Sequence, residues 1–380
     1  MPIWIDTDEA LRRICQSASK QACLALDTEF VWERTYYAQL ALIQLSWGGG
    51  GCVLIDPLSI SDPTPLADLL KNKNITKVLH EAASDLPIIW RWCNQEDMMP
   101  ASIFDTRLAA AFCGMGLACS LNKLLTDILQ ITLEKSETRS NWLQRPLTAK
   151  QMQYACDDVI WLPQLAEELK KRMIKFDNLH RFAEEMQQFE QPGYYAQEQP
   201  DDAWNRFAAS AAHMPPEALA TLKTLAAWRE SKARELDLAR PRLLRDEQVL
   251  AIIELQPRSI AELHKVPGLW PKNIKKYGAE ILTAVEQGRQ NHQQETMTKP
   301  IRKLSTDIFR KRVRRLQNLV KKRAEPQGID PTLLATRKEL ASLVSAAADR
   351  RLDEAALPQG WRAELLGESF KEILIQDFKE

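Results

Sequence analysis

The stretch that decides the fold of the N-terminal half is CLALDTEF, residues 23–30, where a short apolar run leads directly into Asp27, Thr28 and Glu29. The apolar run predicts a central strand. Because side chains alternate between the two faces of a strand, Asp27 and Glu29 point to the same side. Two adjacent carboxylates repel each other and are costly to bury unless a divalent cation neutralises them. The pair is therefore a candidate metal site, and a solvated strand end is the plainer alternative.

The segments that follow this strand predict a mixed sheet flanked by helices. Apolar runs at 38–47 and 52–58 enclose the four glycines 48–51, a pattern typical of a hairpin. Strands first, and then mixed strands and helices, indicate an α/β or α+β domain over residues 1–190. Within it we also expect a strand at 76–82, a helix at 84–92, a strand continuing as a helix at 102–113, and one long amphipathic helix at 148–173 that Thr148 can cap.

The C-terminal half has a helical pattern and an internal repeat. Residues 191–206 are polar, contain proline and glycine, and predict a linker. Beyond it, a shift of 90 residues places Pro241 on Pro331 and, with one inserted residue, Trp270 on Trp361. Matches that recur in order predict two copies of one small helical domain, at 207–288 and 302–376.

Charge divides unevenly along a chain whose formal net charge is zero. Residues 1–200 carry 19 Lys and Arg against 26 Asp and Glu, a net −7, whereas residues 201–380 carry 32 against 25, a net +7. One half could hold cations while the other binds a polyanion, and two ordinary solvated surfaces would give the same pattern.

The bulk composition excludes several classes of protein. The 380 residues are 45% hydrophobic and 27% charged, which is typical of a globular protein of two or three domains. No apolar run approaches the ~18 residues that a membrane span needs, and we see no signal peptide. Seven cysteines without a CxxC pair argue against a disulfide framework and a cysteine-type zinc site, so we expect free thiols in a reducing cytoplasm.

A second group of candidate residues lies in YACDD, residues 154–158. Tyr154 and Asp158 are four positions apart on the predicted helix and share a face, where a phenol and a carboxylate can hold a metal and orient a water. Asp157 is rotated by about 100° and is expected at the surface. Taken alone, the motif also fits a surface acid beside a half-buried tyrosine.

Two further candidates lie in HEAASDL, residues 80–86, just after a predicted strand. Asp85 is near a helix start, where an acid is commonly only a favourable helix-end charge. His80 could act as a base, but a single histidine at a strand end is more often structural, and we leave it out of the catalytic set.

Five of these residues resemble, in order and spacing, the signature of the DEDD exonuclease superfamily in its tyrosine-containing branch: Asp27, Glu29, Asp85, Tyr154 and Asp158. The sequence around them is similar to the ribonuclease D family, in LDTEFVWERTYYAQLALIQL (26–45), HEAASDL (80–86), IFDTRLAAAFCG (103–114) and RSNWLQRPLTAKQMQYACDDVIWL (139–162). The first helical repeat resembles the helicase-and-RNase-D C-terminal (HRDC) domain, in LAAWRESKARELDLARPRLLRDE (225–247) and IAELHKVPG (260–268). The other helical repeat resembles a diverged copy of the first, and its GWRAELLG (360–367) is also similar to ribonuclease D.

This resemblance implies a fold and an activity. The expected fold is a ribonuclease H-like mixed-sheet exonuclease domain followed by two all-α, HRDC-type domains. The expected activity is a 3′–5′ exoribonuclease that releases nucleoside 5′-monophosphates, with Tyr154 orienting the attacking water. Two divalent ions, Mg²⁺ or Mn²⁺, would activate that water and stabilise the leaving 3′ oxygen, bound by Asp27, Glu29, Asp85 and Asp158.

The resemblance also implies partners. The expected substrate is RNA with a 3′ end, in particular tRNA precursors, and we expect a cytoplasmic monomer with no membrane partner. Asp105, which also recurs in such proteins, is expected to be a structural cap or a supporting acid and not a ligand.

Two other functions stay open. Werner-type DNA 3′–5′ exonucleases share the catalytic signature, and HRDC domains also occur beside DNA helicases; degradation of matched RNA and DNA strands would separate the two. A non-catalytic nucleic-acid-binding protein with an inactive nuclease fold is the third possibility. Retention of all five expected residues argues against it, and metal-dependent loss of 3′ nucleotides would eliminate it.

Candidate substrate contacts come from three places. In the loop before the 148–173 helix, Arg139, Trp142 and Arg145 could contact a phosphate and stack on a base, or anchor the loop. Thr28 and Tyr37 are candidates for the terminal-nucleotide site, although Tyr37 and its neighbour Tyr36 could equally be core residues.

The third place is a basic run at 299–323, with eleven Lys and Arg against one acid, Asp307. Arg310, Arg312 and Arg315 fall close together on an expected helix. Such a run is often only a solvated face. Beside a nuclease domain we favour contacts to phosphates, which give affinity without reading sequence.

Overall fold

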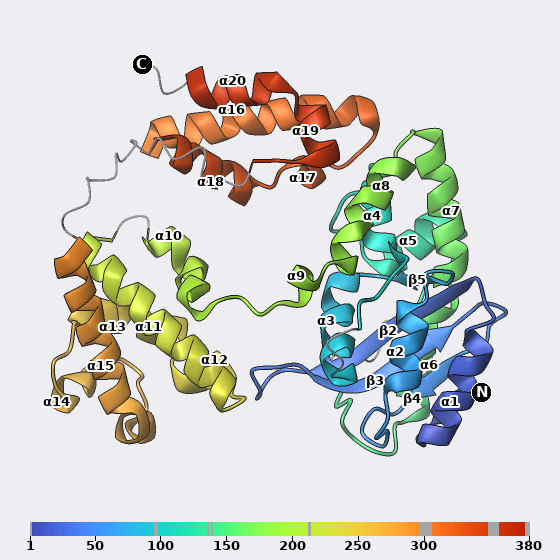
Figure 1. Ribbon diagram of the computed structural model, residues 1–380, viewed down its shortest axis with the longest axis horizontal. Coiled ribbons are helices and arrows are strands. Elements are labelled where there is room, and N and C mark those ends of the chain that lie inside the picture. The colour runs from blue at the N-terminus through green and yellow to red at the C-terminus, as the bar shows by residue number, and fades with distance from the viewer. Residues whose placement is uncertain are drawn as a thin grey trace. The chain divides into compact units, whose positions relative to one another are not determined.

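The computed structural model describes residues 2–94, 98–134, 137, 140–211, 214–295, 306–348 and 357–376. The chain forms two compact units (Figure 1). The first consists of Met1–Phe30, Leu40–Tyr195 and Ile301–Glu380, and the second of Val31–Gln39 and Ala196–Pro300. The short segment Val31–Gln39 thus belongs to the second unit. The strands that precede and follow it belong almost entirely to the first.

A six-stranded mixed sheet is the centre of the first unit, with the strand order β1-β4-β3-β2-β5-β6. β3 and β4 pair antiparallel around the glycine turn, as predicted, whereas β1–β4, β2–β5 and β5–β6 pair parallel. Gly48, Gly49 and Gly50 all have positive φ, a conformation that other residues rarely adopt. The strands are β1 (Ile3–Ile5), β2 (Cys23–Val31), β3 (Gln39–Ser46), β4 (Val53–Ile55), β5 (Thr76–Leu79) and β6 (Ile103–Asp105).

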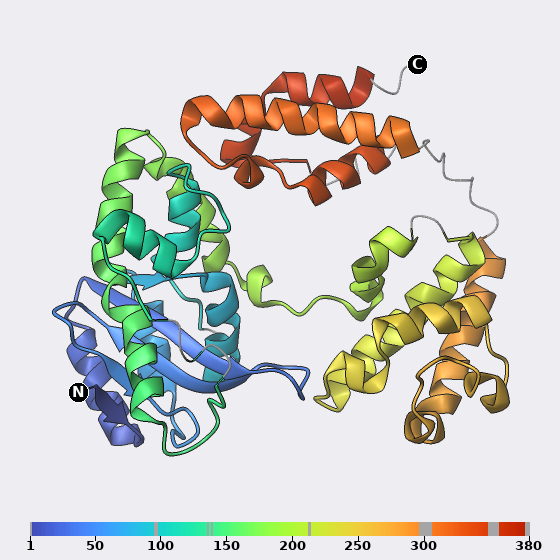
Figure 2. The same ribbon diagram turned by 180° about the vertical axis from the view of Figure 1, so that it is seen from behind.

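Helices cover both faces of this sheet, since every residue of β3 from Leu40 to Ser46 is buried. α1 and α2 lie over the face seen in Figure 1, and α6 lies in front of the sheet in Figure 2. These elements are α1 (Asp8–Ala18), α2 (Thr64–Lys71), α3 (Ala82–Cys93), α4 (Thr106–Ala111), α5 (Leu121–Leu124), η1 (Leu125–Leu129), α6 (Ala149–Ile160), α7 (Leu162–Lys175), α8 (Leu179–Met186), η2 (Gln187–Glu190) and α9 (Pro192–Tyr195).

The prediction of a single long helix at 148–173 is wrong, because the structure has two helices there. Thr148 caps α6 as expected, accepting a hydrogen bond from the backbone N–H of Gln151, whose side chain in turn accepts from the N–H of Thr148. α6 ends at Ile160 and α7 begins at Leu162. Pro163 has no N–H to continue the hydrogen-bond ladder across Trp161, so a new helix starts instead.

The C-terminal segment of the first unit is a separate helical bundle. Its first helix buries Val313, Leu316 and Val320 at helical spacing, and they share a core with residues such as Leu340 and Leu374. The elements are α16 (Thr306–Ala324), η4 (Glu325–Gln327), α17 (Pro331–Leu334), α18 (Arg337–Ala348), α19 (Gly360–Leu366) and α20 (Glu368–Gln376).

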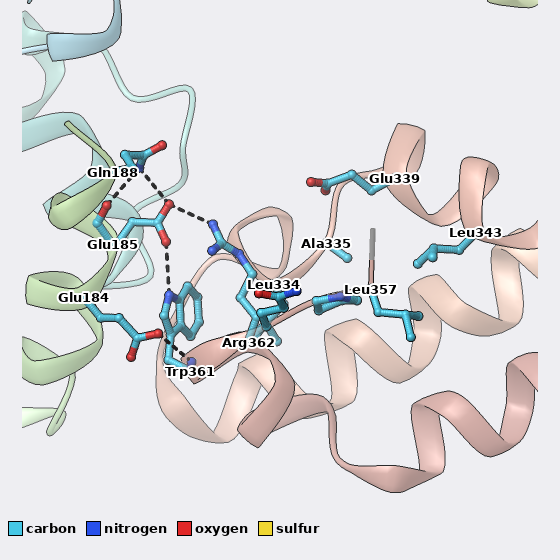
Figure 3. Close-up of a pocket in the computed structure, with 12 residues that line it drawn as sticks. Glu184, Glu185, Gln188, Leu334, Ala335, Glu339, Leu343, Leu357, Trp361 and Arg362 are labelled. Carbon is cyan, nitrogen blue, oxygen red and sulfur yellow. Dashed lines mark hydrogen bonds and ion pairs between the residues drawn. The ribbon is translucent and has the colours of Figure 1, made fainter. Parts of the chain in front are cut away.

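This bundle docks on α8 through Trp361, which is 2% exposed. The indole N–H of Trp361 donates to Oε2 of Glu185 at 3.1 Å, and Arg362 forms an ion pair with Oε1 of the same carboxylate at 2.8 Å (Figure 3). Glu184 accepts the backbone N–H of Trp361, and a Cβ at Gly360 would collide with that carboxylate. A hollow of about 380 Å³ lies beside these contacts, and none of the predicted catalytic acids lines it.

The second unit is helical in its described residues, apart from Val31–Gln39. The predicted linker at 191–206 is not structureless, because it contains α9 and most of η3 (Pro200–Phe207). α11, α12 and α13 begin at Pro216, Arg240 and Asp246, and α16, α17 and α18 repeat this order at the spacing that the 90-residue shift predicts. The other elements are α10 (Ala208–Ala211), α11 (Pro216–Glu235), α12 (Arg240–Leu243), α13 (Asp246–Leu255), α14 (Ile260–Leu263) and α15 (Pro271–Glu295).

Segment Val31–Gln39 is held in this unit by a buried polar cluster around Tyr36. The Tyr36 hydroxyl donates to Glu230 and accepts from Arg234 at 2.8 Å and Arg240 at 3.0 Å. Burial acts to raise the pKa of Glu230, but the hydrogen bonds from Arg240 and Tyr36 outweigh it and lower the pKa to about 2. Oδ1 of Asp237 also accepts the backbone N–H of Tyr36 at 3.1 Å.

Candidate active site

Two elements bring three of the four predicted acids together. β2 carries Asp27 and Glu29 on one face, as the alternation of strand side chains predicts. α6 carries Asp158. One carboxylate oxygen from each of these three residues lies within 4.8 Å of the others, so the group has the geometry of a metal site. Whether a metal fits there depends on the chemistry of its ligands.

The fourth acid, Asp85, enters from the first turn of α3 and is 4% exposed. The hydroxyl of Thr28, between the two strand acids, donates a hydrogen bond to Oδ1 of Asp85. The buried hydroxyl of Thr28 thus positions Asp85, and a contact of Thr28 with substrate stays a prediction.

The start of α3 is fixed by Asp105. Its carboxylate accepts the backbone N–H of Ala82 at 2.7 Å and, as the N-cap of α4, the N–H groups of Arg107 at 2.8 Å and Leu108 at 3.1 Å. One buried acid thus caps two helices. The interpretation of Asp105 as a structural cap is confirmed.

Burial and mutual repulsion act on the acids of β2. Burial is the largest cause that raises the pKa of Asp27 well above its usual value, followed by the charges of Asp85, Asp158 and Glu29. Burial, and then the charges of Asp158 and Asp85, raise the pKa of Glu29 to about 9. Glu29 would therefore hold a proton at neutral pH unless a cation replaced it.

The two helical acids behave in the same way. Burial raises the pKa of Asp85 to about 7, against the opposing hydrogen bond from Thr28. Burial, and then the charge of Asp157, raise the pKa of Asp158 to about 7, against the hydrogen bond from Tyr154. Within the described ranges no Lys or Arg forms an ion pair with any of the four acids. An oxygen-only ligand set without a protein cation fits a hard divalent ion such as Mg²⁺ or Mn²⁺.

Tyr154 lies on the same face of α6 as Asp158, as the spacing predicts, and hydrogen bonds to it. Its ring packs against Trp142, with the centroids 6.0 Å apart. Asp157 was expected at the surface, but it is half-buried and accepts a hydrogen bond from Nε2 of Gln153 at 2.8 Å.

The loop before α6 is held by an ion pair that the sequence did not reveal. Arg145 binds both oxygens of Asp56, at 2.7 and 2.8 Å, and donates to the backbone oxygens of Ala41 and Trp142. Trp142 is 3% exposed and packs against Tyr154. These contacts fit the loop-anchoring alternative for Arg145 and Trp142, and a contact of either residue with substrate stays a prediction. Arg139 lies outside the described residues.

The other substrate candidates lie elsewhere in the chain. Tyr37 belongs to the second unit, where its ring packs edge-on against Tyr36 at 4.7 Å. Arg310 and Arg315 are exposed on α16, whereas Arg312 is half-buried. The role of these four residues in binding a substrate stays a prediction.

His80 is structural, as the sequence indicated. Its Nδ1 lies 2.9 Å from the hydroxyl of Thr106, which in turn donates to the carbonyl of Leu79. Burial, and then the charge of Arg107, lower the pKa of His80 to about 4, so the ring is neutral near pH 7.

Comparison with known proteins matches both parts of the chain. A family model described as a 3′–5′ exonuclease matches residues 2–174, and one described as an HRDC domain matches residues 218–285. Within the described residues, no helix is both long enough and apolar enough to cross a membrane.

Relatives match nearly from end to end. Ribonuclease D of Cronobacter turicensis is 37% identical over 97% of this chain and 99% of its own length. Ribonuclease D of Escherichia coli K12 is 34% identical over 97% of each chain. A crystal structure of Escherichia coli RNase D, described as an exoribonuclease involved in structured RNA processing, superposes with a TM-score of 0.86 at 32% identity and covers 99% of each chain.

Proposed function

The chain belongs to the ribonuclease D family of exoribonucleases, and on that premise we propose that it removes nucleotides from the 3′ end of RNA with two divalent ions held by its acidic cluster. The observation that carries the proposal is the convergence of four acids, one buried and three half-buried, of which three have carboxylate oxygens within 4.8 Å of one another. Their raised pKa values mark a place where the fold concentrates negative charge that only cations or protons can offset.

Asp27, Glu29, Asp85 and Asp158 would hold the ions, and Mg²⁺ or Mn²⁺ suits ligands that offer only oxygen. When bound, two such ions stabilise both the attacking and the leaving oxygen of an in-line displacement at phosphorus. The alternation of β2 aims Asp27 and Glu29 at one point, and Thr28 keeps Asp85 turned toward them.

Tyr154 orients the attacking water through its hydroxyl. The hydrogen bond to Asp158 and the packing on Trp142 fix the direction of the phenol. The water oxygen attacks the terminal phosphorus, and the bond from phosphorus to the 3′ oxygen of the preceding nucleotide breaks. The products are a nucleoside 5′-monophosphate and an RNA one nucleotide shorter.

We propose tRNA precursors as a substrate. Support comes from the similarity to an enzyme described as acting in structured RNA processing, and from the net +7 of residues 201–380, which suits a polyanion. We also propose that 302–376 is a diverged second HRDC-type domain, since its helices follow those of the matched domain in order and spacing. The domain limits proposed are 1–190, 207–288 and 302–376, with 191–206 as the linker after the first.

A monomer in the cytoplasm is the proposed form and location. One chain supplies all four acids and Tyr154, and all seven cysteines are free thiols. Neither proposal requires a second copy or an oxidising compartment.

Arg310, Arg312 and Arg315 on α16 are proposed phosphate contacts. Replacing all three by Gln should weaken RNA affinity and reduce the slope of its dependence on salt. Lys171→Gln on α7, an exposed cation paired with Glu168 at 2.7 Å, is the matched charge control. Unchanged affinity and salt slope in the triple variant would remove α16 from the binding surface.

The test of the whole proposal uses RNA labelled at its 5′ end and carrying a single-stranded 3′ tail. A ladder that shortens from the 3′ end with Mg²⁺, disappears with chelator and is lost in Asp27→Asn would support it. A DNA strand of matched sequence is run in parallel. Faster loss of nucleotides from the DNA would favour a DNA exonuclease, and no shortening with any divalent ion would favour a non-catalytic binding protein.

A further inference from the structure

An exposed tryptophan flanked by cations marks the surface of the second unit. Trp270, just before α15, is 37% exposed. The guanidinium of Arg245 lies 5.3 Å from the centroid of its ring, and the ammonium of Lys272 lies 5.6 Å from it. Both cationic residues are themselves exposed. An indole between positive charges at a protein surface is a combination that binds single-stranded nucleic acids, through base stacking and phosphate contacts.

The backbone around Trp270 is fixed from two sides. Nδ2 of Asn273, which is 6% exposed, donates to the carbonyls of Arg242 at 2.8 Å and Leu243 at 2.9 Å. Nε2 of Gln248 donates to the carbonyl of Gly268 at 2.6 Å. Two buried amides thus tie the start of α15 to α12 and the loop before α15 to α13. The indole is held on a rigid support, which lowers the entropic cost of binding a ligand.

The surrounding sequence is basic without compensation. Residues 238–245, LARPRLLR, contain three arginines and no acid, and residues 264–276, HKVPGLWPKNIKK, contain four lysines and no acid. Arg240 is engaged by Glu230, but none of the others forms an ion pair in the described part of the unit. The nearest acid in sequence, Asp246, is taken by Arg229 at 2.8 Å. Arg245 and Lys272, which lie beside Trp270, are therefore available to an anion.

We propose that Trp270, Arg245 and Lys272 form a binding subsite for single-stranded RNA, in which a base stacks on the indole and the two cations contact the flanking phosphates. The choice of RNA as the ligand rests on the proposed function. Arg245 and Lys272 have long side chains, so they can leave the ring for a phosphate and free its face for a base. Stacking of this kind tolerates any base, so the subsite binds without reading sequence.

The experiment measures the affinity of the full chain for a labelled oligouridine in chelator, where no hydrolysis occurs. Trp270→Ala should bind about tenfold more weakly at one salt concentration while keeping the slope against salt, since stacking is not an ionic contact. Trp270→Tyr should recover most of the affinity because it retains a ring. Arg245→Gln and Lys272→Gln should each reduce the slope, by about 0.7 for every phosphate that is no longer neutralised.

The control is Trp32→Ala. Trp32 is 71% exposed, more than any other large hydrophobic residue described, and within the described part of the chain no cation lies over its ring. The variant should bind as the wild type does. Equal affinities of wild type and Trp270→Ala, or an equal loss of affinity in Trp32→Ala, would overturn the proposal.

A second readout separates this subsite from the proposed function. Metal-dependent shortening of RNA by the wild type, combined with unchanged binding in Trp270→Ala, means that the function holds and the subsite fails. Trp270-dependent binding without any shortening means the reverse.

Discussion

Thr28 and Asp85, 57 positions apart in the chain, are joined by a hydrogen bond in which the buried threonine hydroxyl donates to Oδ1 of the acid. Thr28→Val keeps the shape of the side chain and removes this donor. We expect the affinity for Mg²⁺ to fall by about ten- to hundredfold, which is the usual effect of removing a supporting hydrogen bond from a metal ligand. Activity should recover at high Mg²⁺.

The control for this prediction is Thr28→Ser, which retains the hydroxyl and should stay close to the wild type. The measurement is the rate of RNA shortening as a function of Mg²⁺ concentration. A Thr28→Val enzyme with the Mg²⁺ dependence of the wild type would show that Asp85 is positioned without the hydrogen bond from Thr28.

Tyr154→Phe should lower kcat by about 10²–10⁴, the range for a group that positions or transfers a proton, with little change in KM. The hydrogen bond from Tyr154 lowers the pKa of Asp158, so its removal should move the acidic limb of the pH–rate profile to higher pH. The measurement is the single-turnover rate across pH. A variant whose rate falls equally at every pH, with no displacement of that limb, would contradict the coupling between the two residues.

We predict that the stabilisation of the folded protein by a bound metal depends on pH. Folding raises the pKa of Asp85 and Asp158 to about 7 and of Glu29 to about 9. Without metal, these groups therefore stabilise the fold at low pH, and that stability is lost as pH rises through these values. The gain in Tm on adding Mg²⁺ should be larger near pH 9 than near pH 6, because the ion must displace protons at low pH but relieves repulsion at high pH.

Asp27→Asn provides the control, since it removes one of the repelling charges. In chelator near pH 9 its Tm should exceed that of the wild type, by about 2–4 °C for each kcal/mol of repulsion removed. Scanning calorimetry or dye-monitored melting would measure both effects. A Mg²⁺ gain that is independent of pH would mean that the acids are ionised in the metal-free protein.

Trp361→Ala should cost about 3–5 kcal/mol of unfolding free energy, as expected for a fully buried indole. The change removes the packing against Phe112, whose ring centroid is 5.1 Å away, and the hydrogen bond to Glu185. Denaturant unfolding would measure the destabilisation, with the exposed Trp32→Ala expected within about 0.5 kcal/mol of the wild type. A destabilisation below about 1 kcal/mol would contradict this account, since a fully buried indole that packs well costs more to remove.

Much of the site could be predicted because local geometry places its residues. Alternation on β2 aims Asp27 and Glu29 together, and a four-residue spacing on α6 aims Tyr154 and Asp158 together. The cap at Thr148 also follows from residues close by in sequence. Asp85 was weak evidence alone, and only the resemblance to a known family made it a ligand candidate.

The features that the sequence could not decide depend instead on residues far apart in the chain. From the sequence, an arginine in a loop before a helix, such as Arg145, could either contact RNA or anchor the loop. Its observed partner, Asp56, is 89 residues away in the sequence. Trp142 gave no sign that it packs against Tyr154. The break at Trp161 did have a local signal in Pro163, but a regular apolar pattern continued across it. Long-range pairs of this kind are set by the fold and leave no trace in the periodicity of either segment.

The pairing of Tyr36 with Glu230 has a consequence for synthesis of the chain on the ribosome. The two residues are 194 positions apart, so at about 5–20 residues per second Tyr36 is made roughly 10–40 s before its partner. During that interval the strands on either side of Tyr36 can already pair. The helices that Tyr36 will contact, α11 and α12, have not yet been synthesised. Tyr36 therefore lacks its hydrogen-bond partners until translation has passed Glu230.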